Sequence, residues 1–264
     1  MSESVSEQPV AFITGGARGI GLAVGQWFLA HGHRVALVDI DGATLGATEA
    51  TLDNPQRVLA ITADISLPEQ VDAAVARVQA TFGRIDALVN NAGIAVFKPL
   101  GETSFAEWRQ VMATNLDGVF LCTQACAEVM KRGGRGGAVV NIASISGLRA
   151  STLRVAYGTS KAAVIHLTRQ QAVELGNLGI RVNAVAPGPV DTAMAKLVHT
   201  PAIRADYHSA IPLNRYGTPE EIAQAVGWLC SAEASYINGQ VLAADGGFDA
   251  AGIGLPTLRR SGAN

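Results

Sequence analysis

Short runs of β-branched and other apolar residues alternate with longer amphipathic stretches along almost the whole chain. The runs have the length of strands, and the stretches between them have the length and period of helices. Strands that are apolar at nearly every position are buried on both faces, which is typical of parallel sheets with crossover helices. Strands are therefore expected at Val10–Thr14, Arg34–Asp39, Val58–Ala63, Ala87–Asn90, Ala138–Ile142, Arg181–Ala186 and Gln240–Ala243. Helices are expected at Gly19–His31, Asp41–Leu52, Leu67–Phe82, Tyr157–Leu175 and Thr218–Ser231, and over most of Phe105–Met130.

This alternation predicts an α/β fold, with a doubly wound parallel sheet of about seven strands and helices on both faces. No repeat, low-complexity segment or linker divides the sequence, so we expect a single domain over residues 1–264. Residues 1–9 are expected to form a flexible N-terminus and residues 248–264 a C-terminal tail. The segment 190–216 is expected to be irregular.

The composition narrows the classes of partner. A net charge of -2, without any basic cluster, indicates no nucleic acid, and no apolar stretch is long enough to span a membrane. The start of the chain is polar and acidic, unlike a signal peptide. Cys122, Cys126 and Cys230 contain no CxxC pair and fit a reducing compartment, so a cytoplasmic protein is expected. Cys122 and Cys126 share a helical face without His or carboxylate neighbours, so we expect buried thiols and no metal.

A glycine-rich loop, Thr14-Gly15-Gly16-Ala17-Arg18-Gly19-Ile20-Gly21, joins the first expected strand to the first expected helix. Glycines let the backbone approach a pyrophosphate closely, and the helix N-terminus supplies N–H donors. The order strand, glycine loop, helix predicts a Rossmann-like dinucleotide site. The loop residues expected at the cofactor are Gly15, Arg18, Gly19, Ile20 and Gly21.

Asp39 ends the second expected strand, eighteen residues after Gly21. A carboxylate at that position accepts hydrogen bonds from the adenosine ribose and repels a 2′-phosphate, which favours NAD over NADP. Ile40, which follows it, is expected to lie against the cofactor as well. Arg18 is either a surface residue or a partner for a 2′-phosphate. Asp64 is either a helix-start carboxylate beside Ser66 or, together with Ile65, a contact for the adenine.

Tyr157 and Lys161 are four residues apart and share one face of an expected helix, and Ser144 follows an expected strand thirteen residues before Tyr157. A free phenol has a pKa near 10, and general acid–base work near neutral pH needs a lower value. A Lys ammonium and an oxidised nicotinamide nearby both favour the phenolate. Ser144 lies where ligands of open α/β sheets bind, and its hydroxyl is expected to hold the substrate oxygen. Ser146 is either a second substrate contact or a turn residue.

With these motifs the chain resembles the short-chain dehydrogenase/reductase family, in its shorter, non-extended branch. The resemblance covers almost everything from Val10 to Gly247. Residues Thr14–Gly21 match the glycine motif of the family, and Asn90-Asn91-Ala92-Gly93 match its N-N-A-G motif. The catalytic set of the family is matched by Asn115, Ser144, Tyr157 and Lys161, and its nicotinamide-side motif by Pro187-Gly188 with Val190 and Thr192.

The resemblance implies a role for each matched residue. Tyr157 would be the acid/base, Ser144 would polarise the carbonyl, and Lys161 would tune Tyr157 and hold the nicotinamide ribose. Asn115 would hold a water of the proton relay, and its position inside a helical run also invites a local kink. The remaining cofactor contacts implied are Asn91 near the adenosine side, its neighbours Ala92 and Gly93, Tyr157, Pro187, Gly188, and the Val190 backbone with Thr192 at the carboxamide. The family also implies a homotetramer, or a dimer.

The expected function is an NAD(H)-dependent oxidoreductase that interconverts a secondary alcohol and its ketone, with a cyclic alcohol, polyol or sugar among the open substrates. An alternative is a 3-oxoacyl-carrier-protein reductase that uses NADPH, against which Asp39 counts. The gap between Tyr157 and Lys161 is shorter than in the enoyl reductases of the family. An alternative of another class is a redox sensor that binds NAD without turnover, which would not need the complete Ser, Tyr and Lys set.

The substrate pocket is expected to mix apolar groups with Arg149 and Arg154, which leaves acidic substrates open. Its expected lining is Ile94–Phe97, Ser146–Arg154, Pro189, Met194, Leu197, Val198 and Tyr207. The tail after residue 247 is either a disordered terminus or a segment that folds over an active site and helps to choose the substrate.

Overall fold

The computed structural model describes residues 8–252, apart from the side chains of Met194 and Leu197. Most of the segment 1–9 and of the tail 248–264 therefore lies outside the described residues, and so do the expectations for them.

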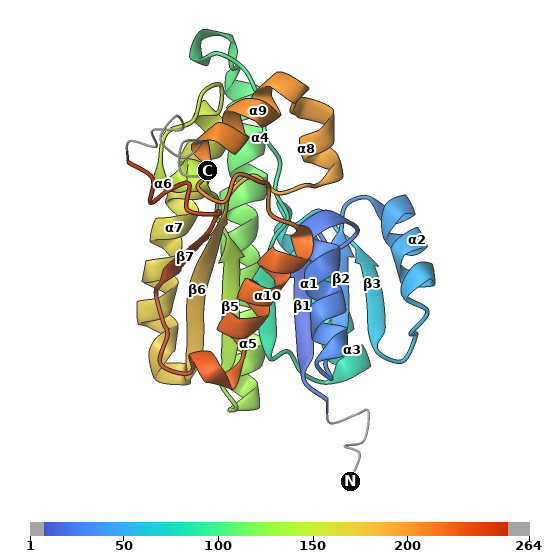
Figure 1. Cartoon of the computed structure of the whole chain (residues 1–264). Helices are drawn as coiled ribbons and strands as arrows, with labels where there is room; N and C mark the ends of the chain where they lie inside the picture. The colour runs from blue at the N-terminus through green and yellow to red at the C-terminus, as the bar shows by residue number, and fades with distance from the viewer. Residues whose placement is uncertain (1–7, 253–264) are drawn as a thin grey trace.

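Within the described part, seven parallel strands form one sheet, as predicted, and their order is β3-β2-β1-β4-β5-β6-β7 (Figure 1). The strands are β1 (Val10–Thr14), β2 (Arg34–Asp39), β3 (Val58–Thr62), β4 (Ala87–Asn90), β5 (Gly137–Ile142), β6 (Ile180–Pro187) and β7 (Val241–Ala244). The chain runs outward from β1 through β2 to β3 and then returns to β4, from which it continues in the opposite direction. Ligands of such sheets bind at this reversal, beyond the carboxyl ends of the two central strands.

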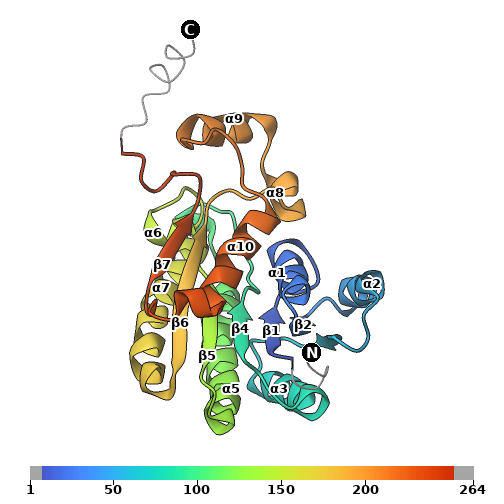
Figure 2. The same cartoon turned by 60° about the horizontal axis from the view of Figure 1, so that its bottom comes forward.

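Helices cover both faces of the sheet (Figures 1 and 2). One face carries α1 (Gly19–Ala30), α2 (Gly42–Leu52) and α10 (Pro219–Cys230), and the other carries α3 (Pro68–Phe82), α5 (Gly118–Gly133) and α7 (Val155–Leu175). Successive strand residues point to opposite faces, so Phe12 packs in the core under α3 and α5, whereas Ile13 packs in the core under α1 and α10. Both positions have to be apolar, which explains the nearly continuous apolar strands.

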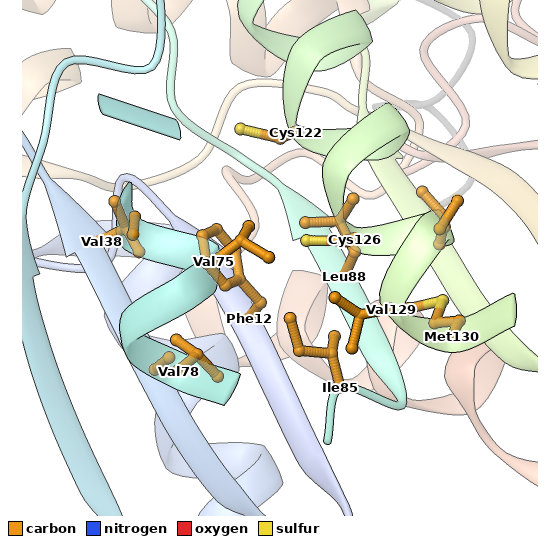
Figure 3. Close-up of a cluster of buried hydrophobic side chains, with 14 of the residues drawn as sticks. Phe12, Val38, Val75, Val78, Ile85, Leu88, Cys122, Cys126, Val129 and Met130 are labelled. Carbon is orange, nitrogen blue, oxygen red and sulfur yellow. The ribbon is translucent and has the colours of Figure 1, made fainter. Parts of the chain in front are cut away.

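The two cysteines of α5, Cys122 and Cys126, lie in the first of these cores, and Cys126 is close to Leu88 (Figure 3). Both thiols are free and fully buried. Burial raises the pKa of Cys122 to about 12 and that of Cys126 well above its ordinary value. Thiols this far from ionisation act as small apolar groups, which confirms the prediction.

The segment 190–216 is more regular than expected, because it contains α8 (Ala193–Val198) and α9 (Pro201–Ala210). Thr192 and Thr200 cap these helices through their hydroxyl oxygens. Both helices are short, and their few apolar positions do not form a long periodic pattern. They lie beyond the carboxyl ends of the strands, at the top of Figure 1.

Other helices near the strand ends also differ from the expected pattern. The helix expected over Phe105–Met130 is divided into α4 (Phe105–Met112) and α5 by a π-helical turn, η3 (Ala113–Asp117), so the regular helix is interrupted at Asn115, where a local kink was expected. A short helix, α6 (Ile145–Leu148), follows β5, and α7 begins two residues earlier than expected. No helix of the described residues has both the length and the apolar character that crossing a membrane requires.

Candidate active site

The loop after β1 is fastened to the loop after β4 by hydrogen bonds around Thr14. The hydroxyl oxygen of Thr14 accepts from the backbone N–H groups of Asn91 and Ala92, at 3.0 and 3.1 Å. In return, the side-chain amide of Asn91 donates to the carbonyl oxygens of Thr14 and Gly15, both at 3.0 Å. The sequence placed Asn91 near the adenosine side of a cofactor, whereas its amide here holds the shape of the glycine loop. Thr14, which the sequence reasoning did not single out, is the centre of this junction.

The glycines of the loop are required by its geometry. Gly15 and Gly19 have φ values of 65° and 56°, in the left-handed region that disfavours side chains. A Cβ atom on Gly21 would lie 2.0 Å from the carbonyl oxygen of Gly15. The first turn of α1 can therefore fold directly against the loop only when this position has no side chain.

The N-terminus of α1 has no side-chain cap, because Arg18 occupies the N-cap position without making one. By contrast, Asp41, Ser104 and Thr218 cap α2, α4 and α10 with side-chain oxygens. The open N–H groups and the positive end of the helix dipole suit an anionic acceptor such as a phosphate. The residues of this loop thus fit a dinucleotide pyrophosphate.

Asp39 lies at the end of β2, beside this loop. Its carboxylate accepts from the backbone N–H of Ala17 and from that of Asp41, each at 3.0 Å. Arg18 pairs with Asp41 at 3.2 Å, so its charge is already engaged by a neighbouring carboxylate. Two acidic side chains and one paired arginine therefore surround the position expected for the adenosine ribose. Ile40 between them is 66% exposed.

Asp64 and Ile65 follow β3. One carboxylate oxygen of Asp64 accepts from both the N–H and the hydroxyl of Ser66, at 2.9 and 2.7 Å, which is the helix-start alternative. The side chain of Ile65 is buried against Gly118, and so its side chain belongs to the core. Any adenine contact from Ile65 would have to come from its backbone.

The π turn at η3 aims Asn115 at the loop after β4. The side chain of Asn115 is fully buried, and it both accepts from the N–H and donates to the carbonyl oxygen of Ile94, at 2.9 Å each. Its amide also donates to the hydroxyl of Ser160 at 3.0 Å, and Ser160 donates to the carbonyl oxygen of Tyr157 at 2.7 Å. Asn115 therefore links the loop after β4 to the first turns of α7. Ser160 was missed by the sequence reasoning, although it stands directly before Lys161.

Ser144, Tyr157 and Lys161 come together at the end of β5. Ser144 is the N-cap of α6, where its hydroxyl accepts from the N–H of Ser146 at 3.0 Å, and its side chain is close enough to Tyr157 to act on the pKa of the phenol. Lys161 is buried, and its ammonium donates to the carbonyl oxygen of Ile142 at 2.6 Å. A Cβ atom on Gly93 would lie 3.5 Å from the ammonium of Lys161, so the N-N-A-G segment reaches the same place.

The electrostatics of this group are set by burial. Desolvation raises the pKa of Tyr157 above its ordinary value, and the Ser144 hydrogen bond and the charge of Arg154 offset this only in part. Desolvation also lowers the pKa of Lys161 to about 8. The chain's own groups thus do not produce the lowered phenol pKa that the sequence suggested, because the Lys161 ammonium is directed to Ile142 and lies 5.9 Å from the centre of the Tyr157 ring.

The segment after β6 closes the other side of the site. Gly188 packs so tightly on Asp245 that a Cβ atom would lie 2.7 Å from the Asp245 Cα. Val190 is buried, and the hydroxyl of Thr192 caps α8 by accepting from Ala195 at 3.2 Å. The methyl group of Thr192 would lie 3.7 Å from a Cβ on Gly19, so this segment meets the glycine loop. The structure thus brings together the predicted residues from Pro187 to Thr192 with the loop.

Arg154, Ser146, Tyr207 and Phe97 lie beside Tyr157 on the side of α9. The guanidinium of Arg154 lies 4.9 Å from the centre of the Phe97 ring and 6.0 Å from that of Tyr157. Its nitrogens are 3.4 Å from the hydroxyls of Ser146 and Tyr207. Ser146 therefore lies in the group next to Tyr157. This is where a second substrate contact would have to be, and that role stays a prediction. The side chains of Met194 and Leu197, also expected in the pocket, lie outside the described residues.

Comparisons with known proteins agree with this geometry. A family model described as Enoyl-(Acyl carrier protein) reductase matches residues 15–249. The chain is 37% identical to 2-(S)-hydroxypropyl-CoM dehydrogenase 3 of Xanthobacter autotrophicus over 257 residues, which are 95% of this chain and 100% of the relative. It is 38% identical to the 3-oxoacyl-[acyl-carrier-protein] reductase FabG of Chlamydia muridarum over 240 residues, 90% of this chain and 96% of the relative.

Among solved structures, the crystal structure of levodione reductase superposes with a TM-score of 0.87 and 38% identity. The match covers 92% of this chain and 98% of that one. A parallel sheet of seven strands, a glycine loop at its reversal, the Ser144, Tyr157 and Lys161 group, and relatives matched along almost their whole length lead to one conclusion. The chain belongs to the short-chain dehydrogenase/reductase family of oxidoreductases.

Proposed function

We propose that this protein is an NAD(H)-dependent dehydrogenase that interconverts a secondary alcohol and its ketone. The observation that carries the proposal is the meeting of Ser144, Tyr157 and Lys161 at the end of β5, next to a glycine loop whose helix has no side-chain cap. A bound nicotinamide would accept the hydride that leaves the carbinol carbon in oxidation and would return it in reduction. Oxidation thus converts the CH–OH group to C=O, and the hydroxyl proton goes to the protein.

Tyr157 is the proposed acid/base. In oxidation its phenolate takes the hydroxyl proton, and in reduction its phenol returns a proton to the carbonyl oxygen. Ser144 is close enough to Tyr157 to act on the pKa of its phenol, so a substrate oxygen placed between these two hydroxyls would be held by both. A positive nicotinamide next to the ring would favour the phenolate and act against the pKa increase that burial causes.

Lys161 and Asn115 support this chemistry in different ways. The buried Lys161 ammonium is held by Ile142, close to Gly93, where it is suited to bind ribose hydroxyls. Its positive charge then favours the phenolate of Tyr157 over a distance, without a hydrogen bond between the ammonium and the phenol. Asn115 positions α7 through Ser160. The other proposed cofactor contacts are the residues of the glycine loop, Asp39, and the segments 91–93 and 187–192.

NAD is preferred to NADP in this proposal because of the charges around the adenosine position. A 2′-phosphate would face the carboxylates of Asp39 and Asp41, and it would have to take Arg18 from its existing partner. Like charges at this separation are unfavourable, whereas ribose hydroxyls can donate to Asp39.

Three alternatives are weaker. A carrier-protein reductase is favoured by the likeness to FabG, but the NADPH that the family resemblance implies for it fits the Asp39 side poorly. The description of the matching family model names an enoyl reductase, for which the gap between Tyr157 and Lys161 is too short. A sensor without turnover would not need the complete catalytic group.

Self-association is part of the proposal, as the family resemblance implies a homotetramer. Large apolar side chains are exposed on several helices, with Phe105 75% and Val173 80% exposed. Apolar side chains of this kind mark an interface with another subunit where they gather into one contiguous patch. Light scattering coupled to size-exclusion chromatography would give the number of subunits.

The experiment that tests the function measures initial rates of nicotinamide reduction with NAD⁺ and NADP⁺ in parallel. The substrates are open-chain secondary alcohols, cyclic alcohols, polyols and sugars. Turnover with NAD⁺ on one class supports the proposal. Cofactor binding without turnover on any class would favour the sensor, and a preference for NADP⁺ would favour the carrier-protein reductase.

A further inference from the structure

Arg154 is the part-buried arginine at the active site whose charge is not matched by a carboxylate of the described residues. Its polar contacts are the hydroxyls of Ser146 and Tyr207, both neutral and both at 3.4 Å, the long limit of a hydrogen bond. A guanidinium carries five N–H donors, so two such contacts leave most of them without a good acceptor. A partly buried cation in this condition is unfavourable unless something else binds it.

Three carboxylates on the surrounding segments are paired with other cations. Asp249 is 2.8 Å from Arg149, Asp191 is 3.3 Å from Arg204, and Glu107 is 2.5 Å from Lys98. Two part-buried arginines elsewhere also lack a carboxylate, but their donors are used differently. Arg57 and Arg181 each donate to backbone carbonyl oxygens at between 2.5 and 3.3 Å. Arg154 has neither a carboxylate nor a backbone carbonyl oxygen as a hydrogen-bond partner among the described residues.

The backbone is strained at the residue directly before Arg154. Leu153, just before it, has a φ value of 60°, which is unfavourable for a residue with a side chain. The strained turn is held because the N–H of Lys98 donates to the carbonyl oxygen of Leu153 at 3.1 Å and because Lys98 and Arg154 form a β-bridge. Strain of this kind is retained where the surrounding structure fixes it, often at binding sites.

The guanidinium is also close enough to the acid/base to act on the same molecule. The guanidinium carbon of Arg154 lies over the Phe97 ring, 4.9 Å from its centre, so an aromatic side chain borders the cation. Desolvation raises the pKa of Tyr157 and lowers that of His199, and the charge of Arg154 opposes the first shift and adds to the second. A carboxylate, sulfonate or phosphate fits the N–H edge with two parallel hydrogen bonds.

We propose that Arg154 binds an anionic group on the substrate itself, so that the protein oxidises alcohols that carry an oxyanion a few bonds from the carbinol carbon. This proposal rests on the proposed dehydrogenase function, because it names the substrate class of the same site. The carbinol oxygen lies between Ser144 and Tyr157, and the oxyanion lies on Arg154. The Phe97 ring and the Tyr207 hydroxyl border the anion position.

The test uses β-hydroxybutyrate and γ-hydroxyvalerate, each paired with its neutral primary amide of the same shape. Calorimetric titration into the complex of the protein with NADH measures binding whether or not turnover occurs. The wild type is expected to bind a carboxylate at least about tenfold more tightly than its amide, as hydrogen bonds to charged groups allow. Arg154→Gln is expected to abolish this preference, and Arg154→Lys to keep part of it, because the charge remains without the fork.

Arg204→Gln is the matched control. Arg204 also lowers the pKa of His199, so it acts on the same surroundings, but its charge is paired with Asp191. This variant is expected to keep most of the preference for the carboxylate. Circular dichroism and NADH affinity establish that each variant is folded.

The outcomes separate this proposal from the one on which it rests. Equal binding of carboxylate and amide by the wild type would overturn the role of Arg154, even if neutral alcohols were oxidised. A preference for the carboxylate that persists in Arg154→Gln would also overturn the role of Arg154. A preference that depends on Arg154, without oxidation of any alcohol, would support the anion site and would refute the dehydrogenase.

Discussion

The ammonium of Lys161 donates to the carbonyl oxygen of Ile142 at 2.6 Å, two residues before Ser144. This bond joins α7 to the end of β5, so it fixes the helix that carries Tyr157 and Lys161 relative to the strand that Ser144 follows. It also places a cation where it is almost completely shielded from water. The consequences of that burial can be measured.

Burial of Lys161 predicts a specific dependence of stability on pH. Its pKa is about 8 in the folded protein and 10.5 in the unfolded chain, so between these values the folded state has released a proton that the unfolded state keeps. Stability therefore rises with pH through this window, relative to a variant without the group. Comparing wild type with Lys161→Met in urea at pH 7 and pH 10 should show a gain of about 2 to 3 kcal/mol in favour of the wild type. A difference between the two proteins that does not change with pH would contradict the buried ammonium.

Tyr157→Phe should remove the acid/base and leave the ring in place. We expect turnover to fall by about a hundredfold to ten-thousandfold, with NADH affinity nearly unchanged. Tyr236→Phe is the control, because the Tyr236 side chain is fully exposed, and it should keep wild-type rates. Stopped-flow measurement of nicotinamide absorbance gives both quantities. Near wild-type turnover in Tyr157→Phe would mean that another group moves the proton.

The oxidation rate of the wild type should rise with pH as Tyr157 loses its proton. Arg154 lowers the pKa of Tyr157, so Arg154→Gln should move the midpoint of this rise to higher pH. The profile is best recorded with a neutral alcohol, because binding of an anion would then not contribute. A midpoint that stays in place or moves to lower pH would argue against the electrostatic coupling of these two residues.

Asp39→Ala should weaken the discrimination between cofactors. Without this carboxylate a 2′-phosphate meets less repulsion, so the ratio of kcat/KM for NAD⁺ to that for NADP⁺ should fall by about tenfold or more. Asp41→Asn should lower the ratio to a smaller extent, because it releases Arg18. Asp72→Asn on the exposed side of α3 serves as the control. An unchanged ratio in Asp39→Ala would remove the main support for NAD.

Two glycine substitutions separate a needed glycine from a dispensable one. Gly21→Ala places a methyl group 2.0 Å from the carbonyl oxygen of Gly15, so the loop must shift and NADH binding should be lost. Gly46→Ala lies in α2 with open space around the new methyl group. It should raise stability by about 0.5 to 1 kcal/mol, because alanine is the better helix former. Thermal melts and NADH fluorescence measure the two effects, and tight NADH binding by Gly21→Ala would contradict the close approach.

Most of the fold could be predicted because its determinants are local. The strands and the long helices follow from apolar periodicity. The order of the strands, with its reversal between β1 and β4, was not predicted and is given by the tertiary structure. The segment 190–216 was predicted to be irregular, and its helices α8 and α9 were missed. Both helices are short and begin at threonine caps, so they leave no periodic apolar pattern in the sequence. Such helices are stabilised mainly by what they pack against, which a periodic pattern does not reveal.

The sequence by itself determined the class of sheet, the site of the glycine loop, and the set of Ser144, Tyr157 and Lys161, because spacing along the chain places these groups at the carboxyl ends of strands. Only the tertiary structure decided how the groups are charged and aimed. The partner of Lys161, the raised pKa of Tyr157, the bridge from Asn115 to Ser160 and the unmatched charge of Arg154 all depend on burial and on residues far apart in the sequence. Desolvation and charge pairing are properties of the packed molecule, so no local pattern in the chain records them.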